Sequence, residues 1–525
     1  VQQTTDNDTP YTRGEDSGQN QWTWQHYNAT VGYDGTFGRH VVSASAGILY
    51  NIYKTDFSQN GAAGKMVEYR HMTVNGAVNY AYDDRYVATF SFAADGSDNY
   101  RPGNRWGFYP SLGLGWIVSR ERFLRDSRMV DLLKLRASVG KNGWDPMGEM
   151  RYLWEGYYTG RGGLNTGNSE HTWHGGTALS YLPNPDVFAE KSLKYDAGID
   201  LRLWNRLSLN VDLFLEKRSG IVTQDWMIPG ASGVDNPPYR NIGRMTNKGF
   251  EVQLSWADRI GDFNYALTGM ASYNSNKVDY MAEVVTVPTA ARTGRRLDAL
   301  FGYVADGFYD WDDFDVGGEL REGLPKPTFG AVQPGDIKYK NLNGDTVIDE
   351  NDQTAIGDSY LPKLQYSFSL AASYKGFDLF ALFQGAAGRD VNLLDAPLQN
   401  VAFRDNGNVY GIAEGRWAYY PEQGIDTRAT ATYPRLSLQD NSNNYRNSTL
   451  WKRSGDFLKL RNVELGYTFA QPSLSKAGIS KIRIYLSGVN LLTVSRLMRD
   501  YDIDPEILSG HPALKSYNLG LTVTF

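Results

Sequence analysis

The chain has 525 residues with 53 basic and 59 acidic side chains and no cysteine, which gives a formal net charge of −6. The slight acidity argues against a nucleic-acid partner, and the lack of cysteine excludes disulfides and thiolate metal sites. No run approaches the roughly 18 apolar residues of a membrane helix. Aromatic residues make up 13% of the chain, which excludes a disordered polypeptide.

Apolar and polar residues alternate in several segments, which is the pattern of a β-strand with one apolar and one polar face. In chain order the clearest segments are 133–139, 193–203, 207–215, 250–256 and 517–525. Residues 204–206, between the second and third segments, predict a tight hairpin turn. Between Leu460 and Val463 the alternation slips by one residue, which predicts a β-bulge.

The lengths of the strands and connections separate a membrane barrel from a soluble sandwich, which shows the same alternation. We count about 15 strands of roughly ten or more residues, a length that suits a tilted membrane strand. Short connections, such as 83–85, alternate with long ones, such as 142–190, 223–247, 277–361 and 389–454. The sequence therefore predicts an all-β fold: a transmembrane antiparallel β-barrel with short periplasmic turns and long extracellular loops.

The parity of the strands bears on how much of a barrel the chain contains. If the last strand runs towards the periplasm, the first strand, at about 22–34, runs the same way, and residues 1–20 lie outside the cell. A closed single-chain barrel has an even number of strands and both ends in the periplasm. We therefore expect residues 1–525 to be the C-terminal portion of a larger barrel, with the plug domain and the first strands outside this chain.

A series of short motifs follows in a fixed order along the chain. They are Asn241-Ile242-Gly243, Asn247-Lys248-Gly249-Phe250-Glu251, Tyr374-Lys375-Gly376-Phe377-Asp378, Phe457-Leu458-Lys459-Leu460-Arg461-Asn462-Val463, Gly466-Tyr467-Thr468 and the ending 517–525. In order and spacing these motifs resemble the SusC-like (starch-utilisation) TonB-dependent transporters of Bacteroidota outer membranes.

The resemblance implies a plugged barrel of about 22 strands, of which about 15 would lie in this chain. It also implies TonB-dependent uptake of oligosaccharides or oligopeptides in the outer membrane of a Gram-negative, Bacteroidota-like bacterium. The implied partners are a SusD-like surface lipoprotein as a lid and the N-terminal plug-bearing part of the same transporter. Through that part the barrel would couple to the TonB–ExbB–ExbD complex, and its other partners would be outer-membrane lipid and the barrel assembly machinery.

The alternative function is a passive porin-like barrel, or a structural or adhesive one, which needs neither plug nor lid. An outer-membrane enzyme is disfavoured because no hydrolase, nucleotide-binding or kinase motif occurs in the sequence. We accordingly expect no catalytic residues and no organic cofactor.

One loop has the spacing of a calcium site. With Asn341 as its first position, oxygen donors fall at the positions that a calcium loop uses. They are the side chains of Asn341, Asn343, Asp345, Asp349 and Asp352 and the backbone carbonyl of Val347. Thr346 replaces the usual glycine, and Asp352 replaces the usual bidentate glutamate. The alternative is a turn rich in Asn and Asp that is stabilised by its own side-chain hydrogen bonds.

Aromatic residues in the long loops are candidates for substrate contact, because flat rings suit sugar rings and peptide backbones. The candidates are Trp144, Trp154, Trp173, Trp226 and Trp417. The alternative is that they pack the loops against each other and against a lid. The terminal Phe525, on an alternating last strand, resembles the signal that the barrel assembly machinery reads, and the alternative for Phe525 is packing in an aromatic girdle.

Overall fold

The computed structural model describes most of the chain. The described residues are 22–57, 65–145, 152–156, 158–166, 172–179, 181–229, 231, 236–285, 287–395, 400–403, 407–438, 441–469 and 478–525. Residues 1–20, which we expected outside the cell, lie outside the described part. Among the described residues, no helix has the length and apolarity that crossing a membrane requires.

Fifteen strands form one sheet, hydrogen-bonded in the order in which they follow along the chain. They are β1 (Trp22–Phe37), β2 (His40–Phe57), β3 (Lys65–Tyr82), β4 (Tyr86–Ser97), β5 (Trp106–Ile117), β6 (Val130–Trp144), β9 (Glu190–Leu203), β10 (Leu207–Gln224), β11 (Tyr239–Ile260), β12 (Phe263–Tyr280), β19 (Leu364–Tyr374), β20 (Phe377–Ala387), β25 (Phe457–Phe469), β26 (Lys481–Ser495) and β27 (Ser516–Thr524). Neighbours such as β1 and β2, or β26 and β27, pair antiparallel. The predicted all-β antiparallel sheet of about 15 strands is confirmed.

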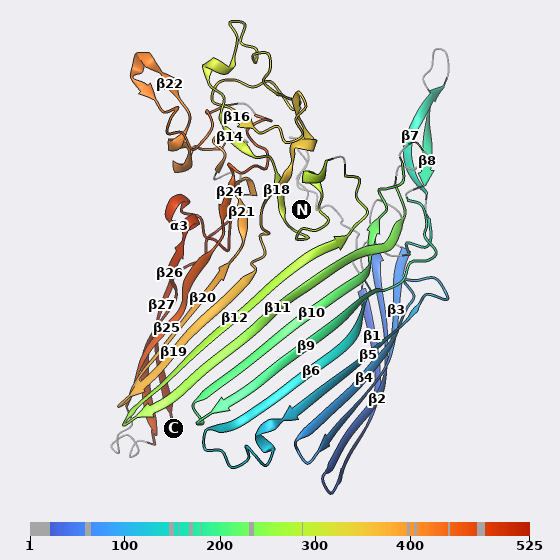
Figure 1. Ribbon diagram of the computed structural model, residues 1–525, viewed down its shortest axis with the longest axis vertical. Helices are drawn as coiled ribbons and strands as arrows, with labels where there is room; N and C mark the ends of the chain where they lie inside the picture. The colour runs from blue at the N-terminus through green and yellow to red at the C-terminus, as the bar shows by residue number, and fades with distance from the viewer. Residues whose placement is uncertain are drawn as a thin grey trace, which may run out of the picture. The chain divides into compact units, whose positions relative to one another are not determined.

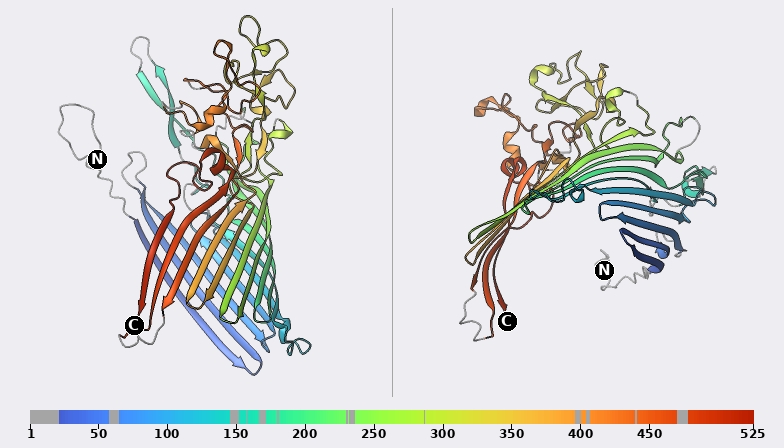
Figure 2. Two further views of the ribbon diagram at one scale, coloured as in Figure 1. Left: turned by 90° about the vertical axis from the view of Figure 1, so that its left-hand side faces the viewer. Right: turned by 60° about the horizontal axis from the view of Figure 1, so that its bottom comes forward.

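The contacts divide the chain into two units. Unit 1 contains residues 1–114, 138–193 and 219–242, and unit 2 contains residues 115–137, 194–218 and 243–525. Within unit 1, β1 to β4 run side by side (Figure 2). Within unit 2, β19, β20, β25, β26 and β27 do the same (Figure 1).

Tight turns join strands at one end of the sheet, as predicted. Trp204 and Asn205 both adopt φ of 53°, and they connect β9 to β10. Two consecutive residues with positive φ are typical of the hairpin turn whose twist matches that of the strands. The predicted bulge is confirmed as well, because the register of β25 against β26 shifts between Leu460 and Asn462.

One predicted long connection is shorter than expected. β10 ends at Gln224 and β11 begins at Tyr239, so the connection predicted at 223–247 is 225–238. β11 is 22 residues long, and its first residues lie beyond the segment in which apolar and polar side chains alternate. A strand that extends past an apolar band no longer has one apolar face, and the sequence pattern that marks it is lost.

The two faces of the sheet differ in the way the alternation predicts. Large apolar side chains on one face are exposed; Leu213 is 57%, Leu486 56% and Leu521 64% exposed. A soluble monomer rarely exposes a continuous apolar surface of this kind, whereas the lipid-facing side of a membrane barrel consists of one. These side chains are not buried in an interior, as a lipid-facing flank requires.

The long connections of unit 2 fold around a hydrophobic core of their own. The core contains Tyr303, Ile337, Ile348 and Trp451, each at most 2% exposed. The same connections contain short antiparallel strand pairs. Two of these pairs are β13 (Leu300–Gly302) with β18 (Thr354–Gly357), and β14 (Ala305–Phe308) with β16 (Ile337–Tyr339). A third pair joins β21 (Asp390–Asn392) to β24 (Lys452–Ser454). Figure 1 labels β14, β16, β18, β21 and β24 in its upper half. We call residues 281–363 and 388–456 the loop core.

Candidate functional site

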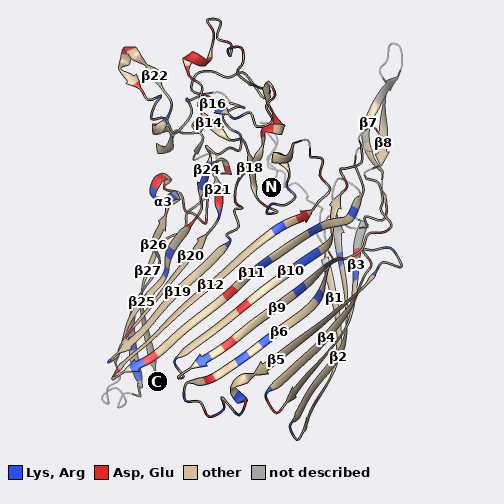
Figure 3. Cartoon of the chain, in the orientation of Figure 1, with Lys and Arg blue, Asp and Glu red and all other residues tan. Residues whose placement is uncertain are grey.

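Residues of both charges recur along β9 to β12 (Figure 3). The central group in unit 2 is Arg136 of β6. Its Nη2 lies 2.6 Å from Asp212 Oδ2, and its Nε lies 3.4 Å from Asp200 Oδ1. Its Nη1 lies 3.6 Å from Asp196 Oδ1. One guanidinium therefore holds carboxylates from two neighbouring strands, β9 and β10, on the same face.

A glycine makes room for this arrangement. Gly198 lies between Asp196 and Asp200 on β9, and a Cβ on Gly198 would come within 2.6 Å of Arg136 Cζ. The same surface is hollowed, with a volume of about 510 Å³, and Glu251, Gln365 and Gln384 also line the hollow. Lys134 also pairs with Asp200, so Arg136 and Lys134 together meet the carboxylates of Asp196, Asp200 and Asp212.

A second charged group of the same kind joins β20, β25 and β26. The Arg483 guanidinium donates to Asp378 Oδ1 at 3.1 Å and also pairs with Glu464. A Cβ on Gly466 would lie 2.6 Å from Arg483 Nη2, so the glycine of the Gly466-Tyr467-Thr468 motif provides the space for this ion pair. Fixed charges of both signs on a strand face suit a water-filled or protein-filled lumen.

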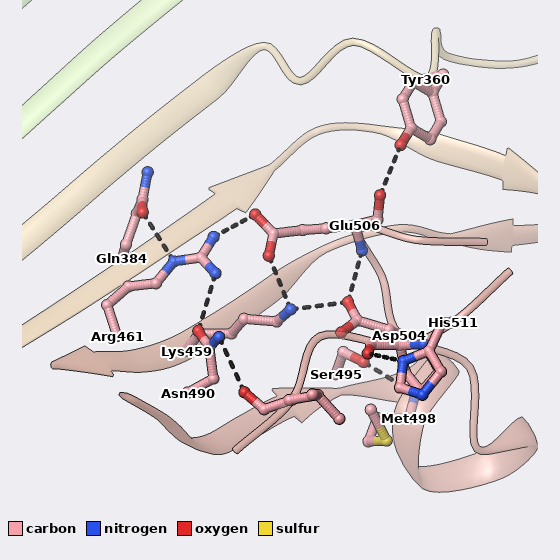
Figure 4. Close-up of polar contacts among 12 residues, drawn as sticks. Tyr360, Gln384, Lys459, Arg461, Asn490, Ser495, Met498, Asp504, Glu506 and His511 are labelled. Carbon is pink, nitrogen blue, oxygen red and sulfur yellow. Dashed lines mark hydrogen bonds and ion pairs between the residues drawn. The ribbon is translucent and has the colours of Figure 1, made fainter. Parts of the chain in front are cut away.

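The third charged group ties the segment after β26 to the sheet (Figure 4). Lys459 of β25 has a fully buried side chain, and its Nζ lies 2.7 Å from both Asp504 Oδ1 and Glu506 Oε2. Arg461 also pairs with Glu506, and its Nε donates to Gln384 Oε1 at 2.9 Å. We call this set of side chains the Lys459 cluster. It holds the segment that follows α3 (Arg496–Tyr501) against β25.

The Lys459 cluster lowers the pKa of both of its carboxyls. Burial alone would raise the pKa of Asp504, but the hydrogen bonds from Lys459 and from the backbone of Glu506 keep that pKa below its usual range. For Glu506, burial is likewise outweighed by Arg461 and Lys459, so its pKa is also lowered. Both side chains are therefore ionised at neutral pH, and the buried ammonium is compensated.

A buried carboxylate organises the loop core. Asp336 is fully buried, and its Oδ1 accepts from Arg435 Nε at 2.7 Å, Asn441 Nδ2 at 3.0 Å and Asn444 Nδ2 at 2.9 Å. These donors come from a segment about 100 residues further along the chain. Burial, with the nearby charges of Asp313 and Asp336, raises the pKa of Tyr309 to about 12. The loop core is a folded unit, and it can therefore present a defined surface.

The predicted calcium loop folds as a series of side-chain-stabilised turns. The side-chain oxygens of Asn341, Asn343 and Asp345 accept the backbone N–H groups of residues 344, 345 and 347. Asp352 is fully buried, and its two oxygens accept from Leu342 N and Asp349 N at 2.7 and 2.9 Å. Among the described residues, no three His, Asp or Glu side chains converge as metal ligands.

This loop fits both of the predicted interpretations. The hydrogen bonds are those of the Asx-turn alternative. Each carboxylate or amide oxygen has a second lone pair, and the donor set around Asn341, Asp345 and Asp352 is the all-oxygen chemistry that Ca²⁺ prefers. Calcium binding therefore stays a prediction.

The aromatic candidates lie in different environments. In unit 1, Trp144 ends β6, Trp173 lies on β8 (Thr172–Leu179), and Trp226 follows β10; all three are more than half exposed. Trp154 is partly buried, with an indole N–H that has no hydrogen-bond partner in the described structure. These four substrate contacts stay predictions.

Trp417, in unit 2, differs from the other candidates. Its side chain is 8% exposed and packs on Gly335, where a Cβ would lie 2.6 Å from the indole ring. This burial fits the alternative of packing within the loops, and substrate contact by Trp417 stays a prediction. Phe525 follows β27 and is 85% exposed, so it is accessible, and its role in assembly stays a prediction.

Sequence reasoning missed the three charged groups around Arg136, Arg483 and Lys459. Lys459 and Arg461 stand in a motif that carried the family resemblance, but no role was assigned to them. The signal that marks these groups is a basic residue at a polar-face position of a strand, with carboxylates at polar-face positions of its neighbours. That signal requires the strand register, which the sequence alone does not supply.

Comparisons with known proteins show which family the chain belongs to. A family model described as TonB dependent receptor-like, beta-barrel, matches residues 1–491. The chain is 26% identical over 554 residues to TonB-dependent receptor P3 of Formosa agariphila, covering 94% of this chain and 51% of the relative. It is 26% identical over 486 residues to TonB-dependent receptor SusC of Bacteroides thetaiotaomicron, covering 86% of this chain and 43% of the relative. The chain thus spans about half the length of the curated relatives it matches.

Among solved structures, the RagAB peptide transporter superposes with a TM-score of 0.71 at 21% identity. The match covers 96% of this chain and 56% of that chain, and it shows a shared fold. The resemblance to SusC-like transporters that the motifs indicated is thereby confirmed. The chain belongs to the TonB-dependent receptor-like β-barrel family of the Gram-negative outer membrane.

Proposed function

We propose that this chain forms the barrel portion of a TonB-dependent importer that takes up oligosaccharides or oligopeptides. The observation that carries the proposal is the two-sided sheet, with exposed leucines on one face and the charged groups around Arg136 and Arg483 on the other. Such a sheet separates lipid from a polar lumen. The work of the protein is then binding and gating, and no step of chemistry on the substrate is required.

The proposal includes the rest of the barrel and its plug. In the sheet of the described residues, β1 and β27 each have a hydrogen-bonded neighbour on one side only. An open strand edge in lipid leaves backbone groups without partners, at a cost of several kcal/mol for each group. We propose that about seven further strands complete a barrel of the 22-strand size class, and that the same N-terminal part carries the plug.

The proposed partners follow from this arrangement. The plug-bearing part would engage the TonB–ExbB–ExbD complex, and the carboxylates around Arg136 would suit a basic surface of the plug. A SusD-like surface lipoprotein would cover the extracellular side. Similarity to SusC of Bacteroides thetaiotaomicron and to a Formosa receptor supports this partner and a Bacteroidota source. The folded loop core, with exposed Trp311, Val316 and Leu438, offers a surface for such a lid.

A calcium ion in the 341–352 loop is part of the proposal. Its role would be structural, since the loop packs Ile348 into the loop core and Asp352 against the backbone of Leu342. An ion there would stiffen one part of the surface that we assign to the lid.

Uptake by the intact transporter tests the proposed function. Cells that carry the full-length protein should accumulate labelled oligomers, and removal of TonB should abolish the accumulation. The purified complex should contain a plug-bearing segment and a lipoprotein. A lone barrel that conducts ions freely in planar bilayers, with uptake independent of TonB, would instead assign the chain to the passive porin-like class.

A further inference from the structure

A second hollow lies on the polar face of unit 2, closer than the Arg136 hollow to the strand ends that carry the long loops. Its volume is about 190 Å³. It is lined by Glu216, Arg218, Met245, Asn247, Asn274 and Asn276. Glu216 and Arg218 are two residues apart on β10, so their side chains share a face. Asn247 of β11 lies directly opposite Asn276 of β12.

Within the part of the chain that the structure describes, the two charges of this hollow differ from Arg136 and Arg483 in their partners. Arg136 and Arg483 each pair with at least two carboxylates. Among the described residues, by contrast, no ion pair or side-chain hydrogen bond is made by the partly buried Glu216 and Arg218. Placing both charges in a partly enclosed hollow without partners is unfavourable unless something else compensates them.

The asparagines in the hollow also have free hydrogen-bonding capacity. Asn247 Oδ1 is buried and accepts no hydrogen bond within the described structure. Asn276 uses its Oδ1 to accept from Leu297 N at 3.0 Å, which leaves its amide N–H groups as donors. A carboxamide offers one acceptor and two donors, which matches the C=O and N–H of a peptide group. The hollow thus combines amide recognition with one positive and one negative charge.

We propose that this hollow binds an extended oligopeptide that carries a cationic and an anionic side chain two residues apart. Successive same-side residues of an extended peptide are about 6.6 Å apart, which is also the spacing of Glu216 and Arg218 along β10. The peptide ammonium or guanidinium pairs with Glu216, its carboxylate pairs with Arg218, and the asparagines bind the intervening backbone. An uncharged oligosaccharide would leave both charges without partners. The inference rests on the proposed import function and narrows its substrate class.

Binding of two blocked tetrapeptides and one sugar to the purified full-length transporter complex tests the proposal. The probes are acetyl-Ala-Lys-Ala-Glu-amide, its uncharged counterpart with Gln in place of Lys and Glu, and maltotetraose. Titration calorimetry should show the charged peptide binding at least about tenfold more tightly than the other two, because charged hydrogen bonds contribute about 1.5–3 kcal/mol each. Glu216→Gln and Arg218→Gln should each remove about tenfold of that affinity. Lys217→Gln, an exposed neighbour on the opposite face of β10, is the matched control and should leave the affinity unchanged.

The double exchange Glu216→Arg with Arg218→Glu keeps the hollow neutral and guards against a folding defect in the single variants. It should keep the preference for the charged peptide over its uncharged counterpart, because an extended peptide that runs in the opposite direction again places each of its charges beside an opposite one. The assignment would be overturned if charged and uncharged peptides bound equally well, or if maltotetraose bound more tightly than the charged peptide. It would also be overturned if Glu216→Gln and Arg218→Gln left the affinity for the charged peptide unchanged. TonB-dependent uptake that persists in those cases would leave the import function standing, whereas loss of TonB dependence in the unmodified transporter would remove the import function itself.

Discussion

Replacing the buried Lys459 by methionine should release the segment that follows α3 from β25. Methionine fills a similar volume but removes the ammonium that lies 2.7 Å from Asp504 and from Glu506. Taking away one partner of a buried ion pair costs about 3–5 kcal/mol, because the other charge stays buried and uncompensated. Asp504 is 4% exposed, whereas Glu506 is 29% exposed and keeps Arg461. We therefore take the lower end, about 3 kcal/mol.

A loss of about 3 kcal/mol raises the population of the opened segment roughly a hundredfold. Hydrogen–deuterium exchange of the full-length complex should show the amides of residues 503–507 exchanging faster by about that factor, with β25 itself unaffected. Lys515→Met, which removes an exposed charge from the same connection, is the matched control and should change nothing. Unchanged protection in Lys459→Met would refute the argument that the Lys459 cluster holds this segment.

The attachment of residues 503–507 to β25 should weaken at low pH and not at high pH. The pKa values of Asp504 and Glu506 are lowered in the folded protein, so their contribution is complete above the ordinary carboxyl pKa of about 4. It is lost as the pH falls from about 4 through the lowered folded-state values. Between pH 6 and pH 8 both carboxyls stay ionised, so the protection of the amides of residues 503–507 against hydrogen exchange should not change with pH. Protection that falls as the pH is raised through that range would contradict the role of Asp504 and Glu506 in the Lys459 cluster.

Three further predictions concern separate parts of the chain. Asp336→Asn removes the charge that Arg435 pairs with. It should lower the stability of the loop core by about 1.4 kcal/mol, so that trypsin cleaves the loop core at a tenfold lower protease concentration. Gly249→Ala brings a Cβ within 1.9 Å of a backbone oxygen, Tyr273 O, and should lower the folded fraction in heat-modifiable gel mobility, with Gly269→Ala, which meets open space, as its control. If the 341–352 loop holds calcium, Asp345→Asn should weaken Ca²⁺ binding to the complex by at least about tenfold in calorimetry, and equal heats in both proteins would exclude the loop as the site.

The sequence predicted the sheet well because one physical pattern repeats in it. The alternation at 193–203 and 207–215 predicted β9, β10 and the turn at 204–206. A slip in the pattern between Leu460 and Val463 predicted the bulge, which the structure places between Leu460 and Asn462. The pattern failed at the start of β11, where the strand continues past the segment in which side chains alternate.

The candidate sites were harder to predict, because they depend on which strands are neighbours and in which register. Arg136 meets Asp212 across 76 positions of sequence, and Lys459 meets Asp504 across 45. Aromatic residues in a long loop give the same sequence signal whether they face a ligand or, like Trp417, pack against a residue of the loop core such as Gly335. The loop core itself has no periodic pattern, and its hydrogen bonds, such as Asp336 with Asn441 and Asn444, join distant segments.

In a barrel of this kind, one face of each strand meets lipid and the other meets water. Because residues 1–525 contain no cysteine, single cysteines can be introduced along β10 for spin labelling in lipid vesicles without removing a native thiol from this part of the protein. Labels at Leu209 and Leu213 should be relaxed by oxygen dissolved in the bilayer, and labels at Asn210 and Asp212 by a water-soluble nickel complex, with a period of two residues. Accessibility without that period, or labels at Leu209 and Leu213 that neither reagent reaches, would contradict this arrangement.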